Sequence, residues 1–505
     1  MLAGCKNYQR NSTHREVSIS SIKKGEVLAI KYCQSCHLLP EPSLLDTKSW
    51  EKGVLPNMGP RLGIFNYGLQ NYPSYKNDMS LTPDFYPAAP ALSMEEWENI
   101  IDYYTAISPD SLPGQNRQKA IQMNLPFFTV QTPQINYQNP ATSYVKINSS
   151  DSLHPVIISD VVKRNIYFFN RQLEVKDSVH TNGPVVDINF MKNAMLVCNI
   201  GVLNPNNGRF GKGEFINTNT SGKLQVDSIA LFDSLRRPVQ LTPADLNRDG
   251  KTDYLICEFG NLVGSLSWME NMSNNKFTRH VIRGFPGPIK AYIDDYNHDG
   301  APDIWALFAQ GEEGIFLFTN DGHGNFTSNE VLRFPPAYGS SYFELADFNK
   351  DGFPDIVYTC GDNADYSTVL KPYHGVYIFL NDGKNNFKQM YFFPINGCYK
   401  AIAKDFDKDG DLDIATIAFF PDSEGQPEEG FVYLENDGNN NFSPYSTQQA
   451  ESGRWLTMDA ADYDGDGYID LILGNFSVAP SLKTSKINWK NYPPFIVLKN
   501  NGKKK

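Results

Sequence analysis

The pattern of hydrophobic and polar residues divides the chain into a polar start, a short helical part and a long β-rich part. No periodic apolar pattern occurs up to about Ser21, which indicates a flexible tether. From Ile22 apolar residues recur at helical spacing and lead into the segment CQSCH. A second helix is predicted from about Asp46, and a third after Ser93, the first residue of a capping-box sequence.

A long loop rich in Tyr, Pro and Asn, residues 66–90, separates the second and third predicted helices. Loops of this length are unusual in compact domains unless something large organises them. Residues 113–129 have the composition of a linker, and the chain is β-rich beyond them. We therefore predict a multidomain protein: a tether (1–21), a small all-α domain (22–112), a linker (113–129) and an all-β domain (130–505).

Short apolar runs recur through the β-rich part, and each follows an Asp-rich loop. Runs of this kind, bounded by turn residues, predict strands. They lie at residues 254–257, 304–307, 356–358, 414–417 and 471–473. The alignment of their loops reveals an internal repeat, which is typical of repeat architectures such as propellers.

The five loops share an Asp, an Asn or Asp, an Asp, a Gly and an Asp at positions 1, 3, 5, 6 and 9, and their starts are 50, 52, 58 and 57 residues apart. This spacing fits a four-stranded propeller blade. Oxygen ligands at positions 1, 3, 5 and 9 suit Ca²⁺, and glycine permits the sharp turn. The sequence predicts about five Ca²⁺ sites, with the ligands Asp245, Asn247, Asp249, Asp253, Asp295, Asn297, Asp299, Asp303, Asp347, Asn349, Asp351, Asp355, Asp405, Asp407, Asp409, Asp413, Asp462, Asp464, Asp466 and Asp470.

The repeat resembles the FG-GAP/VCBS repeat of integrin-type β-propellers. Aromatic-rich segments with Asn-Asp-Gly turns, residues 315–325, 376–386 and 432–441, are expected to close blades. Degenerate copies are expected at residues 154–170 and 185–201, the latter with Asp187 and Asn189 in register with Asp245 and Asn247. The resemblance implies seven blades, with calcium in the last five and residues 493–500 as a closing strand.

The net charge argues against one class of function, and the positions of the cysteines indicate which of them are structural. The formal net charge of -12 and the short basic runs argue against nucleic-acid binding. Four of the seven cysteines are expected to be small buried residues on strands, with a disulfide between the last two left open as an alternative: Cys198, Cys257, Cys360 and Cys398.

The segment CQSCH has the CxxCH pattern of covalent haem attachment, in which Cys33 and Cys36 bind the haem and His37 binds its iron. Residues 25–37 and 91–109 resemble the first and last helices of a class I cytochrome c. A zinc site would need a second ligand pair, and a thioredoxin-like site would need a βαβ setting. The resemblance implies one haem c, with Met58 favoured as the sixth ligand, and Met79 and then Met94 as alternatives.

The first five residues, ending at Cys5, resemble a bacterial lipobox, which implies lipidation of Cys5. Haem c assembly outside the cytoplasm and calcium loops agree with export to the periplasm or the cell surface. No run approaches the length of a membrane span, so the expected membrane attachment is through the lipid.

Together these features predict a membrane-anchored c-type cytochrome that transfers electrons to or from a redox partner protein. The calcium-stabilised propeller would bind that partner or a glycan. A haem-linked sugar oxidoreductase or lyase with its active site on the propeller is one alternative. An adhesive, carbohydrate-binding lipoprotein is another, and fold alone does not decide among them.

Overall fold

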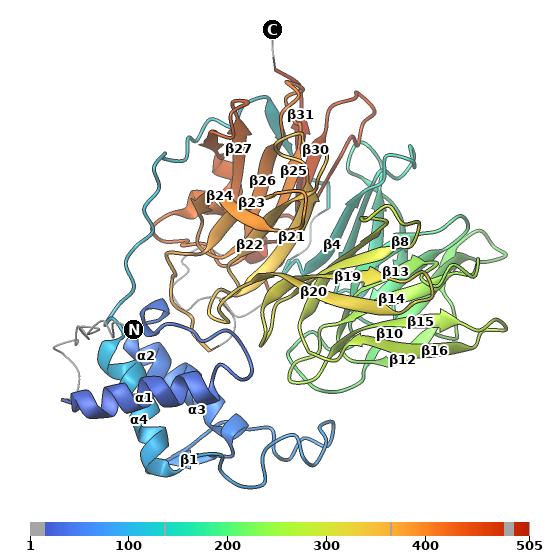
Figure 1. Ribbon diagram of the computed structural model, residues 1–505. Coiled ribbons are helices and arrows are strands. Elements are labelled where there is room, and N and C mark those ends of the chain that lie inside the picture. The colour runs from blue at the N-terminus through green and yellow to red at the C-terminus, as the bar shows by residue number, and fades with distance from the viewer. Residues whose placement is uncertain (1–15, 136–137, 364–365, 479–488, 504–505) are drawn as a thin grey trace.

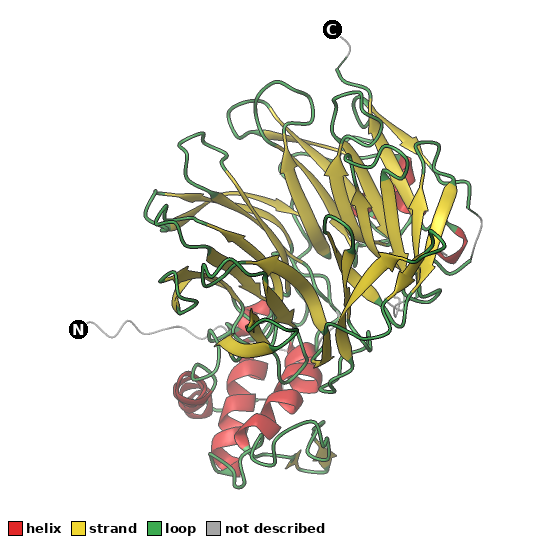
Figure 2. Ribbon diagram, turned by 90° about the vertical axis from the view of Figure 1, so that its right-hand side faces the viewer, coloured by secondary structure: helices red, strands yellow, loops and turns green. Residues whose placement is uncertain are grey.

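The computed structural model describes residues 16–135, 138–363, 366–478 and 489–503. A ring of sheets forms most of the molecule, and a small helical N-terminal region lies against one side of the ring (Figures 1 and 2). Cys5, the predicted lipidation site, lies outside the described residues. In the described part of the chain, no helix is long and apolar enough to cross a membrane.

Two 14-residue helices form the frame of the helical region, α1 (Ile19–Tyr32) and α4 (Met94–Ile107). The predicted capping box at the start of α4 is present. The helices cross in close contact at Gly25, where a Cβ atom would lie 1.9 Å from the Asn99 carbonyl oxygen. Only glycine permits this approach. The predicted first and third helices are therefore confirmed.

Short helical turns replace the single second helix that the sequence predicts. Asp46 caps them, because its carboxylate accepts hydrogen bonds from the Ser49 backbone and hydroxyl at 2.9 and 2.8 Å. A two-residue hairpin lies in the long loop, so the region is not all-α. The elements are η1 (Pro42–Leu44), α2 (Thr47–Ser49), η2 (Trp50–Val54), α3 (Leu55–Met58), η3 (Gly59–Leu62), β1 (Asn66–Tyr67) and β2 (Gln70–Asn71).

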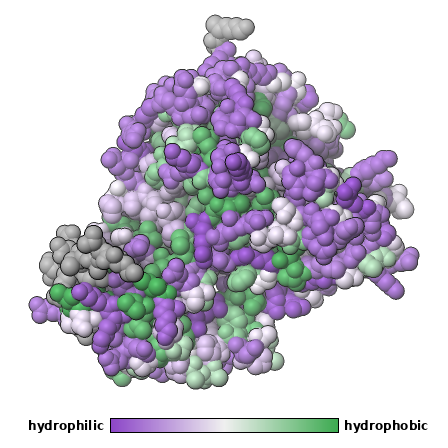
Figure 3. Space-filling view, viewed as in Figure 1, coloured by the Kyte–Doolittle hydropathy of each residue, from purple (hydrophilic) through white to green (hydrophobic). Residues whose placement is uncertain are grey.

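The buried core of the helical region consists of its own residues, among them Trp50 and Trp97, and Ala337 and Val369 of the β-rich part pack against it. In the space-filling view, hydrophobic residues gather in the central and lower parts of the molecule (Figure 3). The structure thus shows a small helical region in contact with the propeller, and a distinct all-α domain is not evident.

Seven sheets form the ring, and each is one blade, which confirms the predicted blade number. Blades one to three consist of β4 (Thr142–Ile147), β5 (Val156–Asp160), β6 (Asn165–Phe169) and β7 (Val175–His180); of β8 (Val185–Phe190), β9 (Met195–Asn199), β10 (Gly211–Thr218), β11 (Leu224–Val226) and β12 (Phe232–Leu235); and of β13 (Pro238–Ala244), β14 (Asp253–Glu258), β15 (Ser265–Asn271) and β16 (Phe277–Arg283).

Blades four to six each contain four consecutive antiparallel strands. They consist of β17 (Pro288–Asp294), β18 (Asp303–Phe308), β19 (Gly314–Asn320) and β20 (Phe326–Arg333); of β21 (Ser340–Ala346), β22 (Asp355–Cys360), β23 (Gly375–Asn381) and β24 (Phe387–Pro394); and of β25 (Cys398–Lys404), β26 (Asp413–Ala418), β27 (Phe431–Asn436) and β28 (Phe442–Tyr445). The five runs predicted after the Asp-rich loops all lie in second strands.

The seventh blade closes the ring by combining the two ends of the propeller. Its strands are β29 (Trp455–Ala461), β30 (Asp470–Asn475), β31 (Phe495–Asn500) and β3 (Phe128–Gln131). Residues 493–500 therefore supply a third strand rather than the closing one, because β3 pairs along the free edge of β31, Phe128 opposite Asn500. The three Asn-Asp-Gly segments likewise contribute third strands, β19, β23 and β27, and a further strand lies outside each.

The four cysteines of the propeller are buried free thiols, as expected for small core residues. Cys198, Cys257 and Cys360 lie on the second strands of their blades, and Cys398 begins the first strand of the sixth. No disulfide joins Cys360 to Cys398.

Hydrogen bonds from side chains to the main chain join the innermost strands of successive blades into a closed ring. Tyr144 donates to Ile188, Asp187 accepts from Leu241, Gln240 pairs with both main-chain groups of Ala291, Tyr292 donates to Phe343, Glu344 accepts from Ala403, Lys400 donates to Met458, and Asp459 accepts from Ile147, at 2.8 to 3.1 Å. Every junction between neighbouring blades thus has at least one such bond.

Asp187 belongs to this ring, and the expected correspondence of Asp187 and Asn189 with the loop residues Asp245 and Asn247 is wrong. Both lie within β8, and a short turn joins β8 to β9 where later blades carry the Asp-rich loop. Their side chains bind the main chain of Leu241 in the next blade. In a strand, residues two apart lie on the same face, and the first two ligands of the Asp-rich loop are also two residues apart. The spacing of Asp187 and Asn189 therefore did not distinguish a strand from a loop.

We predict that Asp459→Ala lowers the free energy of unfolding by about 1–3 kcal/mol, because the Ile147 N–H at the junction of blades seven and one loses its acceptor. Urea denaturation of the full chain measures this change. The control is Asp177→Ala on the exposed face of β7, which should change stability by less than about 0.5 kcal/mol. Equal effects of the two substitutions would contradict the role of the ring.

Candidate functional site

All five Asp-rich loops lie on one face of the propeller, because each joins the first strand of a blade to the second. The contacts with the helical region come from the opposite face. They are made by connections between second and third strands, such as residues 361–374, and by connections between blades, such as residues 334–339. The two predicted sites are therefore separated by the height of the ring.

The loop backbone is held in the same way in every copy. A carboxylate oxygen at position 1 accepts a hydrogen bond from the glycine N–H at position 6, at 2.8 to 3.1 Å. An oxygen at position 5 accepts from the N–H at position 7, at 2.8 to 3.0 Å. The position-6 glycines have φ between 81° and 98°, which favours glycine. Ligand-type oxygens are thus aimed into each loop.

The aspartate at position 9 is fully buried in all five loops (Asp253, Asp303, Asp355, Asp413 and Asp470). One of its oxygens accepts, at 2.8 Å, the backbone N–H of an asparagine that ends the third strand of the same blade. The loop is therefore fixed to its blade through a charged side chain in the interior.

The sequence interpretation missed the role of those asparagines, because it took Asn320, Asn381 and Asn436 as turn residues and Asn500 as the end of a closing strand, and did not consider Asn271. Each also donates through its side-chain amide to the carbonyl at position 8 of the loop, at 2.9 to 3.1 Å. In two blades the amide reaches the loop of another blade, from Asn320 to the Leu246 carbonyl and from Asn500 to the Phe406 carbonyl. The recurring Asn at the end of an aromatic-rich strand was the available signal.

Burial raises the pKa of all five position-9 carboxyls, and neighbouring loop carboxylates add to the shift. The pKa of Asp413 and of Asp470 is raised to about 7. Without a cation, keeping these groups ionised costs free energy, because negative charges are concentrated in a poorly solvated site. A divalent cation would remove that cost.

Carboxylates converge most closely in the last two loops. In the described residues, ligand oxygens of Asp405, Asp407 and Asp409, and those of Asp462, Asp464 and Asp470, lie within 4.8 Å of one another. Buried Asp303 Oδ2 and Asp405 Oδ1 have no hydrogen-bond partner. Oxygen-only donor sets with unsatisfied anionic atoms fit a hard cation such as Ca²⁺.

The CxxCH segment begins at the end of α1. The Cys33 N–H caps the helix by donating to the Ala29 carbonyl at 2.8 Å, and the Cys33 side chain packs against the same core as Met58. Burial raises the pKa of the Cys33 thiol to about 12. Cys36 is exposed, and both thiols are free.

 

The five Asp-rich loops lie on the opposite face of the ring, so the CxxCH segment shares no ligand with them. Both groups of converging carboxylates found in the described residues consist of aspartates alone. A zinc site at Cys33 and Cys36 would need further ligands of the Cys or His type.

The His37 imidazole has one nitrogen engaged and one available. Its Nδ1 lies 2.9 Å from the Leu38 carbonyl oxygen, an arrangement in which Nδ1 donates and Nε2 keeps its lone pair. Burial lowers the pKa of His37, and the hydrogen bond to the Leu38 carbonyl opposes that shift. A neutral imidazole with a free Nε2 is the form that binds a metal.

The three candidate methionines differ in burial. Met58 ends α3 and packs against the core of the helical region, whereas the Met79 side chain is 98% exposed. Met94 begins α4 and is 46% exposed. The structure thus brings Met58, and not Met79, into the cluster that contains Cys33.

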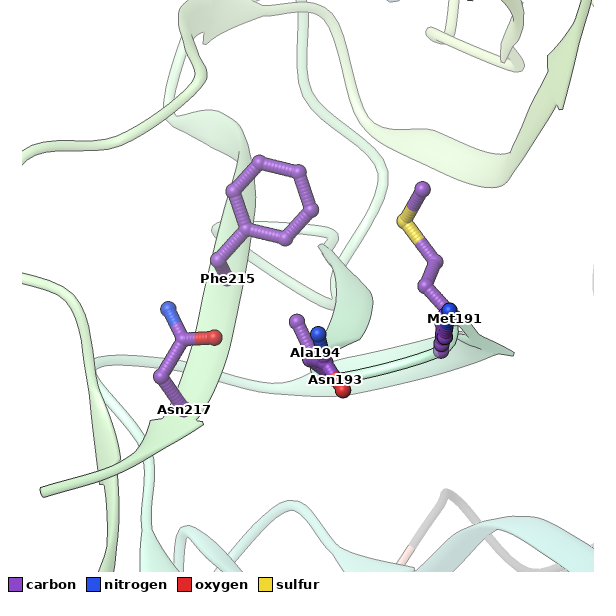
Figure 4. Close-up of a pocket in the computed structure, with 6 residues that line it drawn as sticks. Met191, Asn193, Ala194, Phe215 and Asn217 are labelled. Carbon is purple, nitrogen blue, oxygen red and sulfur yellow. The ribbon is translucent and has the colours of Figure 1, made fainter.

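A separate surface pocket of about 400 Å³ lies beside the short turn between β8 and β9 (Figure 4). Met191, Ala194 and Phe215 give it an apolar lining, with Asn193 and Asn217 beside them. It occupies the part of the second blade where later blades carry the Asp-rich loop. It contains no pair of acidic or nucleophilic side chains that would suggest catalysis.

Comparisons with known proteins support the repeats that the sequence predicts in the β-rich part of the chain. A family model described as an FG-GAP-like repeat matches residues 245–306, 295–358 and 405–473. Cartilage acidic protein 1 from Mus musculus is 30% identical over 181 residues, which cover 34% of this chain and 26% of that protein. The Xenopus tropicalis protein of the same name is 29% identical over 212 residues, covering 37% of this chain and 30% of that protein.

The chain thus spans less than a third of the length of these relatives. Among solved structures, Saccharomyces cerevisiae Sqt1 has 8% sequence identity and a TM-score of 0.42, with 72% of this chain and 96% of that chain covered. A similarity this low supports no functional argument. The family match and the seven sheets agree on one conclusion: the chain contains FG-GAP-like repeats, set in the blades of a seven-bladed β-propeller.

Proposed function

We propose that the protein is an exported, lipid-anchored c-type cytochrome that transfers electrons, and that its calcium-stabilised propeller binds a protein partner or a glycan. One observation carries this proposal: two free thiols and an imidazole with an available nitrogen follow one another at the end of α1, and the half-buried Met58 packs against the same core as Cys33. This is the donor set that covalent haem attachment and axial ligation require.

A bound haem would supply a one-electron iron couple, and the residues of this chain would hold it. Cys33 and Cys36 would attach it covalently, and His37 Nε2 and the Met58 sulfur would bind its iron. The Leu38 carbonyl fixes the orientation of the His37 ring. The buried Trp50 and Tyr104, whose rings lie 4.3 Å apart, would exclude water from this part of the core.

Calcium would have a structural role in the proposed function. The candidate ligands lie on the face of the propeller that does not contact the helical region. A bound ion would neutralise the carboxylates that converge in the loops. The blades would then hold the helical region, and any partner, in a fixed position.

A second candidate function is a haem-linked sugar oxidoreductase or lyase. One observation favours it: the core that contains Cys33 packs against propeller residues Ala337 and Val369, so the two parts share a boundary at which a substrate could bind. Haem reduction driven by candidate sugars, followed in reduced-minus-oxidised spectra, separates the two. Only the enzyme should show it.

We predict that Met58→Ala converts a low-spin oxidised haem spectrum to a high-spin one, because the iron loses its sixth ligand while the thioether links to the cysteines remain. Optical and electron paramagnetic resonance spectra of the purified protein measure the change. Met79→Ala is the matched control, and it should leave the spectrum unchanged because Met79 is exposed. The reverse result would assign the ligand to Met79.

We predict that Cys36→Ala greatly reduces stable haem attachment, because one of the two covalent links is lost. Haem staining of the denatured protein after expression in a host that matures c-type cytochromes measures attachment. Cys257→Ala removes a buried thiol of the propeller and should keep full staining. Equal staining of wild type and Cys36→Ala would refute the attachment site.

We predict that calcium removal lowers the melting temperature of the full chain. A site occupied at about 100 times its dissociation constant contributes about 2.7 kcal/mol, and several sites would dominate a marginal stability. Scanning calorimetry with calcium and with chelator measures the effect. Asp405→Asn should reduce the calcium-dependent gain, whereas Asp437→Asn in the exposed turn of the same blade should not. No response to chelator would argue against the calcium role.

A further inference from the structure

A lysine of the chain lies against predicted calcium ligands in the loop of blade seven. Lys499, on β31, forms ion pairs with Asp464 and Asp466, at positions 3 and 5 of that loop, and its Nζ lies 3.4 Å from Asp466 Oδ2. The next residue, Asn500, is fixed because its N–H donates to Asp470, at position 9 of the same loop, at 2.8 Å. The strand therefore directs the Lys499 ammonium group at the loop.

A second lysine lies against the loop of blade six in the same way. Lys503 forms an ion pair with Asp407, at position 3 of that loop, whose side chain is fully buried. Its Nζ also lies 2.7 Å from Glu435 on β27. The chain just before Lys503 is held in place, because the Asn501 N–H donates to the Phe127 carbonyl at 2.8 Å. One short segment thus supplies an ammonium group to each of two neighbouring loops.

These are also the two loops in which carboxylates converge most closely. Each group of converging carboxylates contains one member that is paired with a lysine, Asp407 in blade six and Asp464 in blade seven. An ammonium group at these oxygens neutralises part of the negative charge of the loop. It also repels a divalent cation at contact distance, because the two charges have the same sign.

The loops of blades four and five lack such a lysine. In the described residues, no basic side chain forms an ion pair with an aspartate at a ligand position of these two loops. Lys350, at position 4 of the loop in blade five, instead reaches Asp411 of the next loop at 2.7 Å. In blade three, Lys251 pairs with Asp249 at 2.8 Å, but both side chains are exposed and solvent weakens the pair.

We propose that Lys499 and Lys503 compete with calcium for the loops of blades seven and six, so that calcium binds there only when their ammonium groups leave. This inference rests on the proposed function, because it requires calcium in the Asp-rich loops. It divides the sites into two classes. Blades four and five bind calcium firmly and hold the propeller together, whereas blades six and seven bind it more weakly and respond to its concentration.

The two lysines differ in how easily they leave. The Lys503 side chain is 46% exposed, and Glu435 is not a predicted ligand, so the ammonium group keeps one carboxylate partner after it releases Asp407. The Lys499 side chain is 25% exposed, and both of its partners are predicted ligands. Calcium should therefore bind to the loop of blade six before it binds to the loop of blade seven.

The test is calorimetric titration of the full-length protein with calcium chloride, after dialysis against chelator and below the calcium-free melting temperature. Lys503→Gln should raise the affinity of one site about tenfold, because a charge-assisted contact no longer has to be broken. Lys499→Gln should raise the affinity of a second site at least as much. Lys503→Arg keeps the charge and should stay near wild type. Lys384→Gln, in the exposed turn between β23 and β24 on the same face, is the matched control.

Thermal unfolding separates competition from a purely structural role of the lysine. In chelator, Lys503→Gln should lower the melting temperature, because the buried Asp407 loses its counter-ion. In saturating calcium the difference from wild type should disappear, because the ion then neutralises the same carboxylate. A decrease of equal size under both conditions would show that Lys503 only stabilises the fold, and it would overturn the inference.

The outcomes also separate this inference from the proposed function. If neither wild type nor any of the variants binds calcium, the calcium role in the proposed function is refuted. If calcium binds, but Lys499→Gln and Lys503→Gln bind it no more tightly than Lys384→Gln does, the inference alone is overturned. If Lys499→Gln does not fold, the titration of Lys503→Gln decides.

Discussion

The ring of hydrogen bonds around the propeller axis is the constraint on which the rest of the molecule depends. Backbone pairing occurs within each blade, so the junctions between blades need other contacts. At every junction a polar side chain of one innermost strand binds the main chain of the next. Because these groups lie in the interior, a polar group left without a hydrogen-bond partner would cost free energy. The hydrogen-bonded ring therefore favours one arrangement of the seven blades relative to one another. The last junction also requires β3 to complete the seventh sheet.

Two of the Asp-rich loops depend on how the blades fit together, since Asn320 and Asn500 donate to the Leu246 and Phe406 carbonyls in the loops of neighbouring blades. Burying a carboxylate is unfavourable unless its oxygens are satisfied, and the strand N–H groups do part of this. The oxygens left unpaired, such as Asp303 Oδ2, define where a cation would add most. The blade geometry and the candidate calcium sites therefore stabilise each other.

The helical region uses the other face of the same ring. Ala337 and Val369 pack against its core, and the Tyr373 hydroxyl donates to the Leu44 carbonyl. On the same face, Arg283 and Arg333 from two neighbouring blades meet on the Glu312 carboxylate. The propeller thus provides a scaffold for the region that carries the CxxCH segment.

The sequence alone was sufficient for features whose signal is local. The capping box at Ser93, the strands after the Asp-rich loops and the spacing of the repeats depend on residues close in the chain, and the structure contains them. Tertiary structure decided the features that depend on distant residues. The pairing of β3 with β31 joins segments about 370 residues apart. Asp187 lies within a strand, where its carboxylate accepts a hydrogen bond from Leu241 of the next blade. The contact of Ala337 with the core of the helical region has no signature in the sequence, because it arises only when the closed ring brings the chain after the fourth blade against that region.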